Sequence, residues 1–195
     1  MNIKQGEKLV KIAREVIENF VHGKEEIDIE VEEWMTEKQG VFTTLNTYPE
    51  NELRGCIGLP YPDQPLYVAL IESAKGATED PRFPPLEEDE LDKIVVEVSV
   101  LSKPKKIEFD SPEDLLKKIT PKKDGLILRY GPYSGLFLPQ VWDEIKEKEN
   151  FLDNLCLKAS LPPGYWLKTG VEIFKFNAQI FKEAEPRGEV IEVKE

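Results

Sequence analysis

Cysteine and histidine are almost missing from this chain, which has two cysteines and one histidine among its 195 residues. Two thiols cannot build a disulfide framework, and together with His22 they supply too few ligands for a tetrahedral zinc site. No apolar run approaches the roughly 18 residues that a membrane-spanning helix needs. The sequence therefore predicts no metal site, no disulfide scaffold and no membrane segment, and it favours a reducing cytoplasm as the location.

Basic residues are also in deficit. The chain has 26 Lys and Arg against 38 Asp and Glu, a net charge of -12, which opposes binding dominated by nucleic-acid phosphates or anionic lipid. The stretch from Lys103 to Lys123 is rich in lysine, but acids interrupt it and no aromatic stacking pattern accompanies it. A solvated helix and its flanks explain this stretch better, so nucleic acid is a disfavoured partner.

Familiar cofactor signatures are absent as well. The sequence has no P-loop, no G-x-G-x-x-G and no H-E-x-x-H, and the surroundings of Ser134 do not form a nucleophile elbow. The acidic cluster between Glu87 and Asp92 lacks the glycine and ligand pattern of an EF-hand, so a solvated acidic face is the favoured interpretation. No cofactor is predicted.

Helical and extended patterns are interspersed along the chain. Apolar spacing, prolines and caps predict helices over 5–21, 65–77, 111–119, 140–148 and 151–159. Alternating or apolar runs predict strands over 41–45, 53–59, 94–101, 125–130, 135–139 and 171–181, the last with a bulge. Short hairpin links favour an α+β fold, a mostly antiparallel sheet covered by helices.

The segment Leu53-Arg54-Gly55-Cys56-Ile57-Gly58 carries the clearest chemical signal. On a strand, Arg54, Cys56 and Gly58 share one face, about 6–7 Å from one to the next. A guanidinium at that spacing could stabilise a thiolate, the reactive form of cysteine. The glycines Gly55 and Gly58 allow close approach of a ligand, but they serve a tight turn or a packed strand crossing equally well. The residues alone leave both interpretations open.

Three other positions need an interpretation. Asp80-Pro81-Arg82-Phe83 forms a stiff segment that either presents Asp80 and Arg82 to a ligand or closes an internal salt bridge with Phe83 buried. Cys156 lies on an apolar helix face, where cysteine packs as a small hydrophobe. His22 lies at the end of the first helix and is expected to stabilise that end.

Taken in order, these segments resemble the AMMECR domain family. The resemblance rests on 40–42, 53–58, 80–83, 98–101, 135–141 and 151–159, and it spans nearly the whole chain. It implies a single domain over 1–195 with two lobes and a cleft between them. The glycine-cysteine segment is the family's usual candidate site, with Cys56 and Arg54 as catalytic candidates and Gly55, Gly58, Asp80 and Arg82 as ligand-binding candidates. Leu59-Pro60 departs from the polar or β-branched continuation expected after the segment.

The resemblance implies no established reaction. Prokaryotic members are commonly associated with Memo-like proteins and radical S-adenosylmethionine proteins, which suggests a shared pathway. This chain has no cysteine triad for an iron–sulfur cluster, so radical chemistry would belong to a partner. The leading hypothesis is a ligand-binding or catalytic cleft centred on Cys56, with no general base assigned. The alternative is a non-enzymatic adaptor or regulatory interaction domain, so whether the chain is an enzyme is left open.

Overall fold

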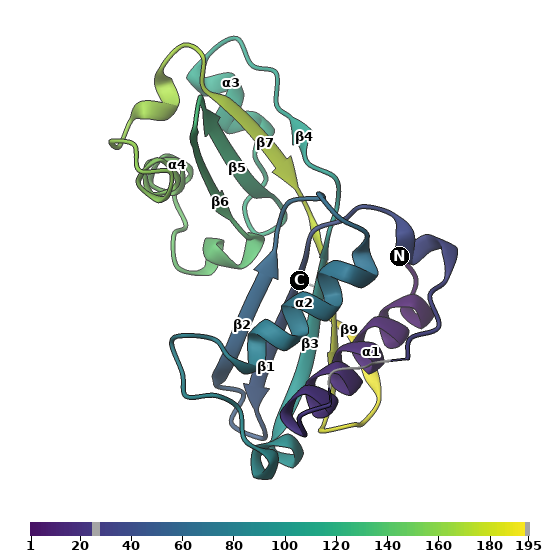
Figure 1. Cartoon of the computed structure of the whole chain (residues 1–195). Helices are drawn as coiled ribbons and strands as arrows, with labels where there is room; N and C mark the ends of the chain where they lie inside the picture. Colours follow the sequence, from purple (N-terminus) through teal and green to yellow (C-terminus); the bar gives the residue numbers. More distant parts are fainter. Residues whose placement is uncertain (25–27, 194–195) are drawn as a thin grey trace. The chain divides into compact units, whose positions relative to one another are not determined.

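The structure is a computed structural model that describes residues 1–24 and 28–193. The chain folds into two compact units that differ in continuity. The first unit combines Met1–Leu101 with Gln179–Lys194, and the second is the continuous segment Ser102–Ala178. The chain thus leaves the first unit after its third strand and returns to it near the C-terminus (Figure 1).

A five-stranded sheet forms the frame of the first unit, in the order β2-β1-β3-β8-β9. Its strands are β1 (Val41–Thr47), β2 (Leu53–Leu59), β3 (Ile94–Leu101), β8 (Ala178–Glu183) and β9 (Val190–Val193). β1 pairs antiparallel with both β2 and β3, and β8 pairs antiparallel with β9. β2 is therefore an edge strand.

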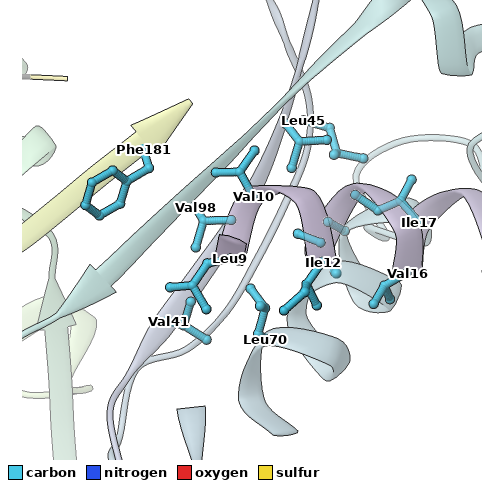
Figure 2. Packing of buried hydrophobic residues seen from close by; sticks show 14 of the residues in the cluster. Leu9, Val10, Ile12, Val16, Ile17, Val41, Leu45, Leu70, Val98 and Phe181 are labelled. Atoms are coloured by element: carbon cyan, nitrogen blue, oxygen red, sulfur yellow. The ribbon is translucent and has the colours of Figure 1, made fainter. Parts of the chain in front are cut away.

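Two helices cover one face of this sheet, α1 (Ile3–Val21) and α2 (Leu66–Thr78) (Figure 1). A capping box between Asn2 and Gln5 starts α1, and Gly23, with a φ of 71°, follows its end. Apolar residues at helical spacing then meet every second residue of the strands. Figure 2 shows this core, including Leu9, Val10, Ile12, Val16, Ile17, Val41, Leu45, Leu70, Val98 and Phe181.

A buried ion pair ties α1 to β8. The guanidinium of Arg14 donates to both carboxylate oxygens of Glu183 and to the carbonyl oxygens of Leu91 (3.0 Å) and Ile94 (2.8 Å). Glu183 also accepts the backbone N–H of Val96 at 2.9 Å. Every polar atom of the pair is engaged, which offsets the cost of burying two charges.

The second unit has a four-stranded sheet in the order β4-β7-β5-β6. Its elements are β4 (Lys105–Lys106), α3 (Pro112–Lys118), β5 (Gly125–Tyr130), β6 (Tyr133–Phe137), α4 (Lys148–Lys158) and β7 (Glu172–Phe176). Ser111 caps α3 through the N–H of Asp114, as its sequence predicts. Leu115 of α3 and Phe151 of α4 join the inward side chains of β5 in one apolar cluster.

Two predicted elements are wrong. The predicted helix 140–148 is a short 3-10 turn, Pro139–Asp143, and α4 begins only at Lys148. The predicted long strand 171–181 is two strands, β7 and β8, which belong to different sheets. Asn177 separates them, because its backbone pairs with Ser102 and its side chain donates to the carbonyl oxygen of Lys123.

The remaining predicted helices and strands lie close to their expected positions, and the α+β class with antiparallel pairing is confirmed. Within the described ranges, no helix is long and apolar enough to cross a membrane.

Candidate functional site

The glycine-cysteine segment forms β2, and its glycines fit tight packing. A side chain at Gly55 would bring its first carbon 2.2 Å from the carbonyl oxygen of Ala77 in α2. Ile57, on the same face of β2, packs against Gly76 of that helix. Gly55 is thus required for the close approach of strand and helix, as the structural interpretation of the sequence held.

Cys56 lies on the opposite face of the sheet, away from α1 and α2. It is directly opposite Thr44 on β1, and Thr44 is directly opposite Glu97 on β3. The Thr44 hydroxyl donates to Cys56 Sγ at 3.3 Å. A thiol, a hydroxyl and a carboxyl thus form a row across three neighbouring strands, with each strand about 4.8 Å from the next.

Next to this row, the same face carries the cross-strand pair of Phe42 and Gly58. Gly58 lies opposite Phe42, whose ring occupies the space that a side chain at Gly58 would fill, 2.1 Å from its first carbon. An aromatic ring over a cross-strand glycine is a stabilising contact in antiparallel sheets.

Asp80 and Arg82 meet Cys56 through its backbone. The Cys56 N–H donates to Asp80 Oδ2 at 2.8 Å, and Arg82 Nη2 donates to the Cys56 carbonyl oxygen at 3.3 Å. The two side chains also pair with each other, with Arg82 Nη2 2.6 Å from Asp80 Oδ2. Because β2 is an edge strand, this Asp80–Arg82 clip supplies the donor and acceptor that a further strand would provide.

Arg54 points elsewhere. Its guanidinium donates to both carboxylate oxygens of Glu90, at 2.7 and 2.8 Å, and to the carbonyl oxygen of Pro84 at 3.0 Å. The pairing register shifts here, with Leu45 opposite Gly55 but Asn46 opposite Leu53, so Arg54 is the extra residue of a bulge. A bulge breaks the alternation on which the expected Arg54–Cys56 proximity depended. The cation next to Cys56 is Arg82.

Burial raises the pKa of the Cys56 thiol, because the thiolate loses hydration there. The hydrogen bond from Thr44 and the charge of Arg82 oppose this rise, whereas the charges of Asp80 and Glu97 add to it. Burial likewise raises the pKa of the Glu97 carboxyl, against the opposing charge of Lys182. Burial and the two carboxylates thus outweigh Thr44 and Arg82, and they favour a neutral thiol, contrary to the expected thiolate.

Asp80 behaves in the opposite way. Its side chain is 2% exposed, yet hydrogen bonds from Arg82 and from the Cys56 N–H hold the pKa of its carboxyl far below the usual range. Asp80 is thus an ionised, fully engaged group. The guanidinium carbons of Arg82 and Arg54 lie 5.7 and 6.0 Å from the centroid of the Phe83 ring.

Other positions singled out in the sequence make none of these contacts with Cys56. Cys156 is fully buried in the apolar cluster of the second unit. His22 ends α1, with its side chain 3.3 Å from Glu88. Among residues 1–24 and 28–193, no three His, Cys, Asp or Glu side chains are grouped to hold a metal ion.

The first unit has a small cavity of about 220 Å³ whose lining begins at Leu59, directly after the glycine-cysteine segment. It is lined by Leu59, Pro60, Tyr61, Asp63, Gln64 and Glu72. The cleft that the resemblance implies between two lobes, and the roles of Cys56, Arg54, Gly55, Gly58, Asp80 and Arg82 in binding or catalysis, stay predictions.

Sequence reasoning missed Thr44 and Glu97. Neither lies in a motif, and only strand pairing brings them beside Cys56. The β1–β2 hairpin was predicted, so a register for it would have nominated Thr44. Glu97 needed the β1–β3 pairing, which joins segments some fifty positions apart in the chain.

Comparison with known proteins gives a consistent result. A sequence model described as AMMECR1 matches residues 10–181. Protein MJ0810 of Methanocaldococcus jannaschii is 52% identical over 100% of this chain and 98% of its own length. Protein MK0488 of Methanopyrus kandleri is 46% identical over 98% and 95%. The crystal structure of the uncharacterized protein PH0010 from Pyrococcus horikoshii matches with a TM-score of 0.89, at 44% identity over 100% of this chain and 99% of the other.

Proposed function

This chain belongs to the AMMECR1 family, and we propose that it binds a small molecule at the sheet face carrying Cys56, where the thiol is the reactive centre. The observation that supports this proposal is the row of Cys56, Thr44 and Glu97 on three adjacent strands. Three groups with different proton chemistry lie together on the face that α1 and α2 leave uncovered.

A neutral thiol must lose its proton before it acts as a nucleophile. Two carboxyls act on Cys56 through their charges, Asp80 and Glu97. Asp80 is held ionised by its hydrogen bonds, with a lowered pKa, so it is a poor proton acceptor. The raised pKa of Glu97 brings it closer to neutral pH, where a general base is most effective. Glu97 is therefore the proposed proton acceptor, a role that no residue had in the sequence analysis.

Arg54 and the Asp80–Arg82 clip enter the proposal as positioning groups. The clip fixes the backbone of Cys56, and Arg54 holds the loop that carries the clip through Glu90 and Pro84. Gly55 allows α2 to approach one face of β2, and Gly58 makes room for the Phe42 ring on the other.

The test is capture of metabolites from a cell extract by the purified protein, read by mass spectrometry. The wild type and a Cys156→Ala control are expected to retain the same compound, while Cys56→Ser and Glu97→Gln lose it. Retention by all four proteins would contradict the proposal. A thiol probe gives a second readout, since Cys56 is expected to react faster than the fully buried Cys156.

Glu97→Gln tests whether the charge of Glu97 acts on the thiol, because the variant removes the charge and keeps the shape of the side chain. Because the Glu97 charge raises the pKa of Cys56, removing it should increase the thiolate fraction and the rate of probe labelling at pH 8. An unchanged rate in a folded variant would mean that Glu97 does not act on the thiol, whereas a lower rate would mean that its role as proton acceptor outweighs the effect of its charge on the pKa of Cys56.

The alternative function is an adaptor that recruits a protein partner, of which Memo-like and radical S-adenosylmethionine proteins are the candidates implied by family resemblance. Its support is that Arg54, Asp80 and Arg82 are all engaged in holding β2. Under this alternative, pull-down of a purified Memo-like protein should survive Cys56→Ser and fail with surface variants away from Cys56.

A further inference from the structure

We propose that the outer edge of β2 holds a carboxylate of the ligand, between the backbone N–H of Gly58 and the guanidinium of Arg82. This inference rests on the proposed function, because it names an anchor for a ligand at the same strand. It differs from that function in the atoms it uses, which are a backbone amide and an arginine rather than the thiol.

The backbone of Gly58 provides the first donor. The Cys56 N–H points away from β1, since it donates to Asp80. In an antiparallel pair the outward direction recurs at every second residue, so the N–H of Gly58 points to the same side. Within the described part of the chain, this N–H has no hydrogen-bond partner, while the equivalent group of Cys56 is occupied.

Arg82 provides the second donor. Its side chain is 57% exposed, and its guanidinium bonds run from Nε and Nη2 to Asp80 and to the Cys56 carbonyl oxygen. Among described residues, Nη1 has no partner. The bond to the Cys56 carbonyl oxygen keeps this guanidinium beside the strand. On the outer edge of β2, the next polar group after that oxygen is the Gly58 N–H.

This pair of donors suits a two-oxygen group. Arg82 Nη2 lies 3.3 Å from the carbonyl oxygen of Cys56, which is the edge group next to the Gly58 N–H. A carboxylate can accept from the guanidinium with one oxygen and from the backbone N–H with the other. Phe42 covers Gly58 on the face of the sheet, and a side chain there is excluded. A ligand therefore reaches this N–H from the edge.

Charge favours a monoanion over a dianion. The first unit has 26 Asp and Glu against 13 Lys and Arg, and its field disfavours a second negative charge. Near Cys56, Arg54 is already neutralised by Glu90, and Arg82 shares its charge with Asp80. A carboxylate satisfies the two donors with one charge, whereas a phosphate carries up to two at neutral pH.

The test is an NMR titration of the full chain with glycine labelled by ¹⁵N, in which only 12 glycines contribute signals. Sodium acetate, sodium phosphate and sodium chloride are compared at equal ionic strength. Acetate should shift the Gly58 amide saturably, at least fivefold more than the amides of Gly131 and Gly164, which lie in open turns. Arg82→Gln should raise the half-saturating acetate concentration at least fivefold, and Arg82→Lys should raise it less.

Two results would overturn the inference. One is a Gly58 shift no larger than that of the two control amides. The other is half-saturation by phosphate at a lower concentration than by acetate. If Arg82→Gln does not fold, the wild-type comparison of salts and the Arg82→Lys variant still decide.

Cys56→Ser distinguishes this inference from the proposed function. The variant should keep the acetate response of Gly58 while losing metabolite capture. If Cys56→Ser loses capture but Gly58 does not respond to acetate, the carboxylate anchor is refuted and the proposed function stands. If Gly58 responds to acetate but Cys56→Ser captures the metabolite as the wild type does, the role of the thiol is refuted and the anchor stands.

Discussion

Removing the charge of Asp80 should destabilise the protein by about 2–4 kcal/mol at pH 7. Asp80→Asn keeps the shape of the side chain but turns one acceptor into a donor. The carboxylate accepts the backbone N–H groups of Cys56 (2.8 Å) and Arg82 (3.0 Å) as well as the Arg82 guanidinium. Hydrogen bonds to a charged group contribute about 1.5–3 kcal/mol each, against about 0.5–1.5 kcal/mol for neutral ones. The guanidinium bonds are counted as small, because the Arg82 side chain is largely exposed.

The loss should depend on pH. In the unfolded chain an Asp titrates near 3.9, and in the folded protein the pKa of Asp80 lies far lower. Its contribution is therefore complete above about pH 5 and declines as the pH falls below about 4, where the unfolded chain gains a proton first. The variant has no titrating group there, so the gap between its free energy of unfolding and that of the wild type should narrow as the pH falls from 5 to 3, and it should close only below the folded pKa of Asp80.

Urea unfolding followed by far-UV circular dichroism at pH 7 and pH 3 measures both free energies, and hydrogen exchange of the Cys56 amide reports the local effect. The matched control is Asp89→Asn, since the Asp89 side chain is 72% exposed and, among the described residues, its ion pair is with Lys93. That control should stay within about 0.5 kcal/mol of the wild type. A similarly small effect of Asp80→Asn at pH 7, or a gap that does not narrow at pH 3, would refute the reasoning.

Three further predictions concern packing and buried charge. Gly58→Ala should lower the free energy of unfolding by about 1–3 kcal/mol because its new methyl meets the Phe42 ring, and a double-mutant cycle with Phe42→Leu should recover part of that loss. Arg14→Met should cost about 3–5 kcal/mol, since it leaves the Glu183 carboxylate buried without its partner; in thermal unfolding, the double variant with Glu183→Met should be more stable than Arg14→Met alone. Arg54→Lys should lower the urea midpoint by losing a two-point contact with its carboxylate partner; an unchanged midpoint would mean that this contact is dispensable.

Local signals in the sequence were sufficient for most of the fold. The apolar spacing of α1, the proline before α2 and the Ser111 cap each act within a few residues, and all three helices are found where predicted. The final strand failed because its alternation continues through Asn177, and the break there depends on Ser102, far away in the sequence. The predicted helix after Pro139 failed because its few apolar residues are satisfied by a single 3-10 turn that buries Trp142.

The candidate site shows the same difference between local signals and contacts that depend on strand pairing. The sequence nominated Cys56, Asp80 and Arg82, and the structure brings these three together. It misplaced Arg54, because one inserted residue reverses the side to which a strand side chain points. One of the two alternatives left open was an internal salt bridge between Asp80 and Arg82 with Phe83 buried; the salt bridge is present, whereas Phe83 is only half-buried. Glu97 was invisible, since its importance comes only from the strand that lies between it and Cys56.

The pair of Arg14 and Glu183 has a consequence for biosynthesis. Arg14 emerges from the ribosome early, but its partner Glu183 lies on β8, the strand next to β3. This strand is translated after the second unit. A nascent chain that ends at residue 178 can complete the four-stranded sheet, yet it leaves the Arg14 guanidinium without its anion and β3 unpaired on the side that β8 later occupies. The first unit therefore keeps β3 as an open sheet edge until β8 and β9 leave the exit tunnel, and chaperones that shield exposed strand edges would act in that interval.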